Sequence, residues 1–449
     1  MPRHTDTIAA VATPVGASAL AVLRASGPDT LRLAGEIVGS PPPPRVARHC
    51  DYKDRAGMLV DDVVLTFYQG PRSYTGEDAF EISCHGNPFI VQKILEDLFA
   101  RGCRPAGPGE FTQRAFLNGR MDLSQAEAVM DVIHARSERA LSAANQQLRG
   151  ALGRRMEGLI ESLLGVLARI EAYIDFPEED LPAEDRAYIG RELNLLLSET
   201  ERLLATSHYG ELLRDGIKAV IVGEPNVGKS SLLNRLVGRD RALVSSEPGT
   251  TRDFIEERII VGPHCLRLID TAGLNPSPAP LEMLGIVKTR ERLAEADLVL
   301  LVLDATDESH HFPPELHTFS KMENCLLLFN KSDLGDHKRV VSGNYHASRL
   351  IHVSALTGEG IGRLVDAISR LADKFQAGES SDGIAINARH SHSLAEARRG
   401  LLDAAAKFGS YDDGIELLAS DLRGVLSSFG EIRGKVDNER MLDQLFATF

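Results

Sequence analysis

Short, continuous apolar runs alternate with helix-type periodicity in residues 211–375. The runs hold almost no polar side chain, which is typical of strands in a parallel sheet that is covered on both faces. We expect strands at Ile217–Val222, Leu266–Ile269, Leu298–Leu303, Cys325–Phe329 and Ile351–Val353. The alternation predicts an α/β domain.

Residues 119–210 show a different pattern, in which apolar side chains recur at helical spacing. One stripe comprises Leu159, Leu163, Val166, Leu167 and Ile170, and a second comprises Leu193, Leu196, Leu197, Leu203 and Leu204. Such stripes are typical of the core of a helix bundle. Helical periodicity returns in residues 376–449, after a polar linker. The simplest arrangement is one helical domain in two halves that meet in space, with the α/β domain inserted between them.

The first 118 residues mix β-type runs with glycine and proline punctuation. We expect strands at Ile8–Ala12, Ala19–Arg24, Asp62–Tyr68 and Ala79–Cys84, and a helix over Val91–Arg101. Strands and helix together predict an N-terminal α+β domain.

Composition excludes several classes of protein. No apolar run approaches the ~20 residues of a membrane helix, and Asp6 interrupts any signal-peptide core. The five cysteines are scattered and form no C-x-x-C pair, which argues against a disulfide framework and a cysteine zinc site. We therefore expect a cytoplasmic protein without a membrane segment.

The net charge of -14 opposes nucleic-acid binding unless a local basic patch exists. The nearest candidate patch is Arg389–His392 with Arg398 and Arg399. Contact with RNA and a solvated helix face are both open interpretations of this segment.

A glycine-rich loop follows the first expected strand of the α/β domain. Residues Gly223–Ser230 have the spacing G-x-x-x-x-G-K-S, and an expected helix begins at Ser231. The glycines let the backbone wrap a phosphate with its amide groups inward, and the helix N-terminus adds a positive dipole. Lys229 is placed to reach the β- and γ-phosphates, and Ser230 to bind Mg²⁺. The motif predicts a P-loop nucleotide site.

Further motifs in the same domain select the base. Asp270–Gly273 (Asp-Thr-Ala-Gly) stands where a Walker-B aspartate approaches Mg²⁺. Asn330–Asp333 (Asn-Lys-Ser-Asp) matches N-K-x-D, whose aspartate accepts hydrogen bonds from N1–H and the exocyclic amine of guanine, a pair that adenine does not offer. Ser354–Leu356 completes the base-binding loop. We expect GTP rather than ATP, on a domain similar to GTPases of the translation-factor class.

The residue that orients the attacking water is not obvious. Leu274 follows Asp270–Gly273, where Ras-like enzymes place a glutamine, and it has no polar group. Glu282 is a candidate for this role. On pattern alone, an equal alternative is that Glu282 is simply an acidic residue at a helix N-terminus. Gly249–Asp253 stands where a switch loop should lie, and its Thr251 is a candidate ligand of Mg²⁺.

Three segments carry a closer resemblance: Gly249–Asp253, Pro108–Glu127, and Ser73–Glu81 with Cys84–Gly86. With them the chain resembles the MnmE family of tRNA modification GTPases, also called TrmE, over essentially its whole length. The N-terminal segments are the specific ones, because many GTPases share the nucleotide motifs.

The resemblance implies a multidomain fold of α+β and α/β type. Its parts are an N-terminal α+β folate-binding and dimerisation domain (1–118), a discontinuous helical domain (119–210 and 376–449) and an inserted P-loop GTPase domain related to translation factors (211–375).

The resemblance also implies the activity. The expected reaction is hydrolysis of GTP to GDP and phosphate, stimulated by K⁺ as GTPase domains associate across a homodimer. With the flavoprotein MnmG, in a heterotetramer, such a protein modifies C5 of the wobble uridine of certain tRNAs, using a 5-formyl or 5,10-methylene tetrahydrofolate. The alternatives are a ribosome-assembly GTPase and a folate-binding GTPase scaffold.

Site residues follow by matching motifs. The P-loop motif and the switch-loop position assign Mg²⁺ to Ser230 and Thr251. The resemblance assigns K⁺ to Asn226, Ser245, Glu247 and Thr250, folate to Arg24, Glu81 and Arg120, and water orientation to Glu282. The expected GTP contacts are Asn226, Val227, Gly228, Lys229, Ser230, Ser231, Ser245, Ser246, Glu247, Pro248, Gly249, Thr250, Thr251, Asp270, Thr271, Ala272, Gly273, Asn330, Lys331, Ser332, Asp333, Ser354, Ala355 and Leu356.

Some positions depart from the family pattern. Arg120 stands where the family commonly has lysine, and Asn275 where arginine is frequent. The family also carries a short Cys-Ile-Gly-Lys-like tail, which the resemblance places after Phe449.

Overall fold

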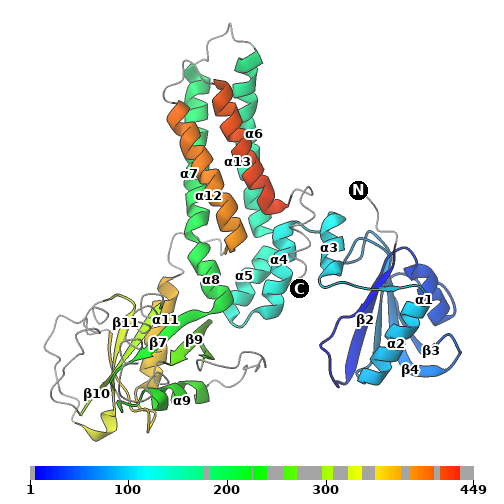
Figure 1. Cartoon of the computed structure of the whole chain (residues 1–449), viewed down its shortest axis with the longest axis horizontal. Coiled ribbons are helices and arrows are strands. Elements are labelled where there is room, and N and C mark those ends of the chain that lie inside the picture. The colour runs from blue at the N-terminus through cyan, green and yellow to red at the C-terminus, as the bar shows by residue number, and fades with distance from the viewer. Residues whose placement is uncertain are drawn as a thin grey trace, which may run out of the picture. The chain divides into compact units, whose positions relative to one another are not determined.

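A computed structural model describes residues 6–175, 183–224, 226–239, 256–270, 296–306, 322–335, 349–375, 384–408 and 415–434. The chain forms two compact units, which are described separately: residues 1–130 with 430–449, and residues 131–429. Figure 1 shows the elements of each unit.

The first unit is built on a six-stranded sheet in the order β3-β4-β5-β2-β1-β6. Its strands are β1 (Ile8–Val11), β2 (Leu20–Ser26), β3 (Ala47–Lys53), β4 (Leu59–Tyr68), β5 (Ala79–His85) and β6 (Arg104–Pro105). Neighbours are antiparallel except β1 and β6, which are parallel. The predicted strands are confirmed, whereas edge strand β3 was not predicted, because most of its side chains are exposed and polar.

Helices α1 (Thr30–Val38) and α2 (Pro88–Ala100) cover one face of this sheet. Asn87 caps α2 by accepting a hydrogen bond from the Phe89 amide, and Pro88 occupies the first helical position, where no amide donor is needed. Even-numbered residues of β5 point into this core, so Glu81 and its odd-numbered neighbours lie on the opposite face.

The Pro108–Glu127 segment forms α3 (Glu110–Leu117) and the start of α4 (Leu123–His134). The guanidinium of Arg114 is fully buried and makes ion pairs with Asp6, Glu77 and Glu110. A buried charge is tolerated only when its partners satisfy it, so this cluster fixes α3 against the loop that contains Glu77.

In the second unit, helices from both halves of the helical region pack together, as Figure 1 shows. They are α5 (Glu138–Leu148), α6 (Ala151–Asp175), α7 (Ala183–Ala205), α8 (Ser207–Asp215), α12 (Ala388–Phe408) and α13 (Ile415–Arg433). Arg398 of α12 pairs with Glu201 of α7, and Arg423 of α13 with Glu171 of α6. Both predicted stripes face the bundle core, with Leu197 and Leu204 only partly buried. The discontinuity of the helical domain is therefore confirmed, whereas its bounds, 119–210 and 376–449, stay a prediction.

The inserted domain holds a second six-stranded sheet in the order β12-β11-β10-β7-β9-β8. Its elements are β7 (Ile217–Val222), α9 (Lys229–Arg239), β8 (Glu256–Val261), β9 (His264–Asp270), β10 (Leu298–Asp304), β11 (Cys325–Asn330), η4 (Ser332–Leu334), β12 (Leu350–His352) and α11 (Ile361–Lys374). All neighbours are parallel except β8, an antiparallel edge strand that was not predicted.

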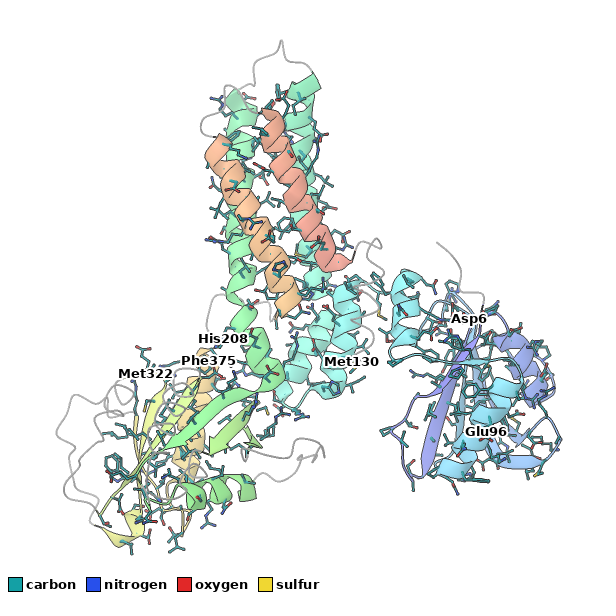
Figure 2. All side chains as sticks on the ribbon, viewed as in Figure 1. Asp6, Glu96, Met130, His208, Met322 and Phe375 are labelled. Carbon is teal, nitrogen blue, oxygen red and sulfur yellow. The ribbon has the colours of Figure 1, made fainter. Side chains whose placement is uncertain are left out.

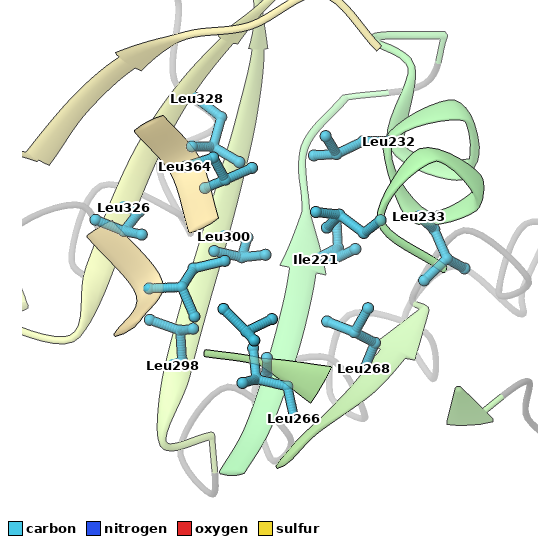
Figure 3. Packing of buried hydrophobic residues seen from close by; sticks show 14 of the residues in the cluster. Ile221, Leu232, Leu233, Leu266, Leu268, Leu298, Leu300, Leu326, Leu328 and Leu364 are labelled. Carbon is cyan, nitrogen blue, oxygen red and sulfur yellow. The ribbon is translucent and has the colours of Figure 1, made fainter. Parts of the chain in front are cut away.

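Both faces of this sheet are buried, as the apolar runs predict. Along β10, Leu298, Leu300 and Val302 enter one core, and Val299 and Leu301 enter the other. Figure 3 shows the first core, where leucines of the sheet meet Leu232 and Leu233 of α9 and Leu364 of α11. Burying one such side chain contributes about 1.5–3 kcal/mol.

The inserted domain contacts the helical domain at its β8–β9 turn. One oxygen of Asp373, in α11, lies 2.9 Å from His264 Nε2 and 2.7 Å from a guanidinium nitrogen of Arg139, in α5. The Arg139 amide also donates to the Pro263 carbonyl. Burial lowers the pKa of His264 despite the hydrogen bond with Asp373.

No described helix has an apolar stretch long enough to cross a membrane.

Candidate functional site

The phosphate loop joins β7 to α9 at the carboxyl edge of the sheet, where open α/β sheets bind their ligands. Gly223 has φ +156°, and a Cβ there would lie 2.2 Å from the Val302 carbonyl oxygen. Gly228 has φ +96°, and its Cβ would lie 2.2 Å from Asn330 Nδ2. Backbone conformation and close approach together require glycine at both positions.

The amine of Lys229 folds back over this loop. Its Nζ donates to the carbonyl oxygens of Gly223, at 2.9 Å, and Glu224, at 2.7 Å. Ser230 is exposed at the second position of α9, and Asn226 is exposed with φ +66°. An ammonium, a hydroxyl and a helix N-terminus thus meet at one place, which suits a polyphosphate with Mg²⁺.

Asn330 connects this loop to the base-binding loop. Its side chain is buried; Nδ2 donates to the Val227 carbonyl at 2.7 Å, and Oδ1 accepts from the Ala355 amide at 2.9 Å. The structure thereby brings together three motifs that are far apart in sequence. They line one pocket of about 620 Å³, formed by Asn226, Gly228, Ser231, Asn234, Arg235, Gly238, Asn330, Lys331, Asp333, Leu334, Ala355 and Leu356.

The N-K-x-D turn leaves the side chain of Asp333 accessible in the pocket. Lys331 has φ +63°, and its Nζ lies 2.6 Å from Asp304 Oδ2. Burial opposes ionisation of Asp304, but hydrogen bonds from Lys331 and Thr306 hold its pKa below the usual value. The Ser332 amide donates to the Val353 carbonyl, and Asp333 is left exposed in the pocket.

Several predicted site residues lie outside the described residues. They are Ser245, Ser246, Glu247, Pro248, Gly249, Thr250, Thr251, Thr271, Ala272, Gly273 and Glu282, together with Leu274 and Asn275. Asp270 is described through its backbone: it ends β9 in register with Ile221 of β7, the strand that leads into the phosphate loop. The roles assigned to these residues stay predictions.

In the first unit, the structure brings Arg24 and Glu81 together. They face each other in register on β2 and β5, with Arg24 Nε 2.7 Å from Glu81 Oε1. The Tyr68 hydroxyl donates to the other oxygen of Glu81 at 3.2 Å. Burial, followed by the charge of Glu81, raises the pKa of Tyr68. The pair is partly exposed on the sheet face opposite α1 and α2, and a carboxylate there can accept hydrogen bonds from a ligand.

Arg120 borders the loop that leads into β5. Gly76 in this loop has φ +81°, and a Cβ on it would lie 3.1 Å from Arg120 Cγ. In the same loop, the Tyr74 ring centre lies 6.0 Å from the Arg24 guanidinium carbon. Asn118 Nδ2 donates to the Thr75 carbonyl. Arg24 and Arg120 therefore both contact this loop.

Two arginines of the candidate basic patch on α12 form ion pairs with glutamates. His390 is buried, and its ring meets the Asn387 amide and the Arg389 guanidinium. Arg398 pairs with Glu201, and Arg399 with Glu396. Only His390 has a buried, structural position; contact with RNA and a solvated helix face both stay predictions for the rest of the segment.

Cys84 and His85 do not form a reactive pair. The Cys84 side chain is buried in the core between the N-terminal sheet and helices α1 and α2, and His85 Nδ1 lies 2.8 Å from Asp61 Oδ1. Burial, followed by the charge of Asp61, raises the pKa of the Cys84 thiol to about 11.

We expect Cys84 to resist alkylation in the native protein. At pH 7.5 on the order of one thiol in three thousand would be ionised, and only the thiolate reacts. Mass spectrometry after iodoacetamide treatment should find Cys84 modified only when the protein is unfolded first. The half-buried Cys50 is the internal comparison. Rapid native labelling of Cys84 would contradict its placement in the core.

Known proteins match the chain along its whole length. A family model described as the MnmE helical domain matches residues 123–449, and one described as the GTP-binding protein TrmE N-terminus matches residues 7–120. The tRNA modification GTPase MnmE of Opitutus terrae is 61% identical over 100% of this chain and 99% of its own length. The tRNA modification GTPase MnmE of Akkermansia muciniphila is 44% identical over 99% of this chain and 98% of its own length.

Among solved structures, the G domain of the T. maritima FeoB iron transporter is 27% identical over 35% of this chain and 98% of its own, with a TM-score of 0.25. A score this low adds nothing to the assignment, which rests on the sequence matches. The chain belongs to the MnmE (TrmE) family of tRNA modification GTPases.

Proposed function

We propose that this protein is a potassium-stimulated GTP hydrolase that acts with the flavoprotein MnmG on C5 of the wobble uridine of certain tRNAs. GTP hydrolysis in tRNA modification follows from membership of the family; the cation, the partner and the folate donor are the proposed part. The observation that carries the nucleotide assignment is Asn330, whose side chain joins the phosphate loop to the base loop beside Asp333.

The described residues support a role for each part of the nucleotide. Lys229 would exchange its two carbonyl partners for the β- and γ-phosphates, and Asp333 would read the guanine edge. Ser230, with the predicted Thr251, would hold Mg²⁺, which neutralises charge on the phosphates. We propose the same set of GTP contacts as the sequence predicts.

The N-terminal unit distinguishes the proposal from a ribosome-assembly GTPase, and repeated GTP turnover distinguishes it from a folate-binding scaffold. A ribosome-assembly GTPase would carry an RNA-binding domain in place of the TrmE-type N-terminus that matches residues 7–120. A folate-binding scaffold would not turn over GTP repeatedly without a partner.

We expect GTP hydrolysis to be faster in KCl than in NaCl, and the difference to vanish in Asn226→Gly. The side chain of Asn226 is proposed to bind K⁺ with Ser245, Glu247 and Thr250, where the cation offsets charge that develops on the phosphates. Glycine is the informative replacement, because the φ of +66° at this position strains alanine. The measurement is steady-state phosphate release at matched ionic strength.

Asn194→Ala on α7 is the matched control, since this exposed asparagine lies in the helical domain. It should keep the potassium effect. Equal rates of the unmodified protein in both salts would remove the potassium proposal and leave the GTP site standing.

We propose that a tetrahydrofolate derivative, 5-formyl or 5,10-methylene, binds at Arg24, Glu81 and Arg120. Arg24 and Tyr68 hold the two carboxylate oxygens of Glu81, and each oxygen has a further lone pair that can accept from the edge of a pterin ring. Glu81→Gln replaces a charged acceptor and should cost about 1.5–3 kcal/mol of binding. That energy corresponds to a dissociation constant for 5-formyltetrahydrofolate raised roughly 10- to 150-fold in a calorimetric titration.

Glu96→Gln is the control for this titration, because Glu96 is exposed on α2, which covers the other face of the sheet. Unchanged binding in Glu81→Gln would move the folate site elsewhere.

The remaining proposals concern assembly. We propose a homodimer formed through the domain of residues 1–118, with a GTPase domain over 211–375 inserted into a helical domain of 119–210 and 376–449. The test is reconstitution with MnmG, tRNA, methylene-tetrahydrofolate, GTP and K⁺, followed by nucleoside analysis. Absence of modified uridine with all components present, in a chain extended by the family's Cys-Ile-Gly-Lys tail, would overturn the assignment of the partner or the donor.

A further inference from the structure

Arg235 lies on α9, the helix that begins at the phosphate-loop residue Lys229. Six residues along a helix correspond to a rise of about 9 Å, so the two side chains reach different parts of the site. Arg235 lines the same pocket as Asp333, Ala355 and Leu356. No sequence motif singles it out.

The Arg235 guanidinium holds two consecutive carbonyl groups of the base-binding loop. Its Nε donates to the Ala355 carbonyl at 3.2 Å, and a terminal nitrogen donates to the Leu356 carbonyl at 2.5 Å. Gly358, with φ +89°, lies directly against it: a Cβ on Gly358 would be 3.3 Å from the guanidinium. The planar fork of arginine suits two adjacent acceptors in a way that a lysine ammonium does not.

The rest of the loop is fixed by bonds that leave these carbonyls to Arg235. The Ser354 amide donates to the Glu359 carbonyl, the Gly358 amide to the Ser354 carbonyl, and the Ala355 amide to Asn330. Because a trans peptide is planar, a carbonyl and the amide that follows it point in opposite directions. Holding the Ala355 carbonyl toward α9 therefore aims the Leu356 amide away from α9.

We propose that Arg235 is a positioning residue for recognition of a 6-oxopurine, the chemical class of guanine. By holding the Ala355 and Leu356 carbonyls, it orients the Leu356 amide as a donor for the 6-oxo group, which adenine replaces with an amine. Since Lys229 and Arg235 belong to one rigid helix, α9 also fixes the phosphate loop relative to the base loop. The inference deepens the proposed GTP site and rests on it.

The test is Arg235→Ala in the full chain, titrated with GDP and with the diphosphate of 2-aminopurine riboside, which lacks the 6-oxo group. We expect the dissociation constant of GDP to rise about tenfold, that of the analogue to stay within twofold, and kcat at saturating GTP to stay within twofold. Arg235→Lys should recover part of the GDP affinity. Arg363→Ala, which removes an exposed arginine on α11, is the control and should change neither constant.

Each other outcome overturns the proposal in a recognisable way. An equal loss for GDP and the analogue would make Arg235 a general structural residue. No loss for either would show that the loop is oriented without it. If the unmodified protein does not prefer GDP to the analogue, the guanine site itself is wrong. If Arg235→Ala does not fold, Arg235→Lys decides: full GDP affinity in that variant contradicts a role for the arginine fork.

Discussion

Replacing Asp333 with asparagine is expected to move the nucleotide preference from GTP to xanthosine triphosphate. The exposed Asp333 carboxylate lies in the pocket with Asn330 and Lys331, where it would accept from N1–H and the exocyclic amine of guanine. Asparagine offers an amide donor in place of one acceptor, which suits the 2-oxo group of xanthine. Losing a paired, charged hydrogen bond costs about 2–5 kcal/mol.

That energy corresponds to a GTP affinity lower by roughly 1.5 to 3.5 orders of magnitude. Competition titrations with GTP and xanthosine triphosphate measure the change directly. Asp366→Asn, which removes an exposed charge on α11, should leave both affinities unchanged. Retained GTP affinity in Asp333→Asn would refute the guanine assignment.

Glu282→Ala is expected to lower kcat by two to three orders of magnitude while GTP affinity stays nearly constant. Leu274 supplies no polar group for the attacking water, and Glu282 is the residue that the family pattern assigns to it. A carboxylate that acts on the water alone contributes to the barrier and not to ground-state binding. The expected loss equals about 2.7–4 kcal/mol of activation free energy.

Single-turnover hydrolysis and a separate nucleotide titration distinguish the two quantities. Glu323→Ala removes an exposed glutamate of the described part of the GTPase domain and serves as the control. A variant with weaker GTP binding and normal turnover would assign Glu282 to the nucleotide instead of the water.

Sequence pattern predicted the inner strands and the edge strand β12, and it missed the edge strands β3, β6 and β8. Strands such as β10 are buried on both faces, so nearly every residue is apolar and the pattern is unambiguous. Strand β8 begins with charged residues at the edge of its sheet, and β3 exposes most of its side chains. Their pairing depends on neighbouring strands, which no local pattern encodes.

The nucleotide site was predictable because each motif is local. The predicted phosphate and base contacts come from short loops with fixed spacing, and the structure brings Asn226, Asn330 and Asp333 to one pocket, with Lys229 on the adjoining phosphate loop. Contacts from a side chain to a distant backbone were not predictable. Arg235 meets a loop 120 residues away, and its partners are carbonyl groups that any residue could supply.

Helix α8 belongs to the hydrophobic core of the GTPase domain. Leu212 belongs to the same buried cluster as residues of β7 and α11. The rings of His208 and Phe375, both labelled in Figure 2, pack edge to face with their centres 6.2 Å apart. His208 also pairs with Asp297, just before β10. A recombinant fragment that starts at residue 211 would cut this helix in half and discard His208. A fragment that starts at Ser207 and ends after Phe375 keeps the whole of α8 together with Phe375 and Asp297, the two partners of His208. We expect this fragment to have a higher melting temperature than the fragment that starts at residue 211.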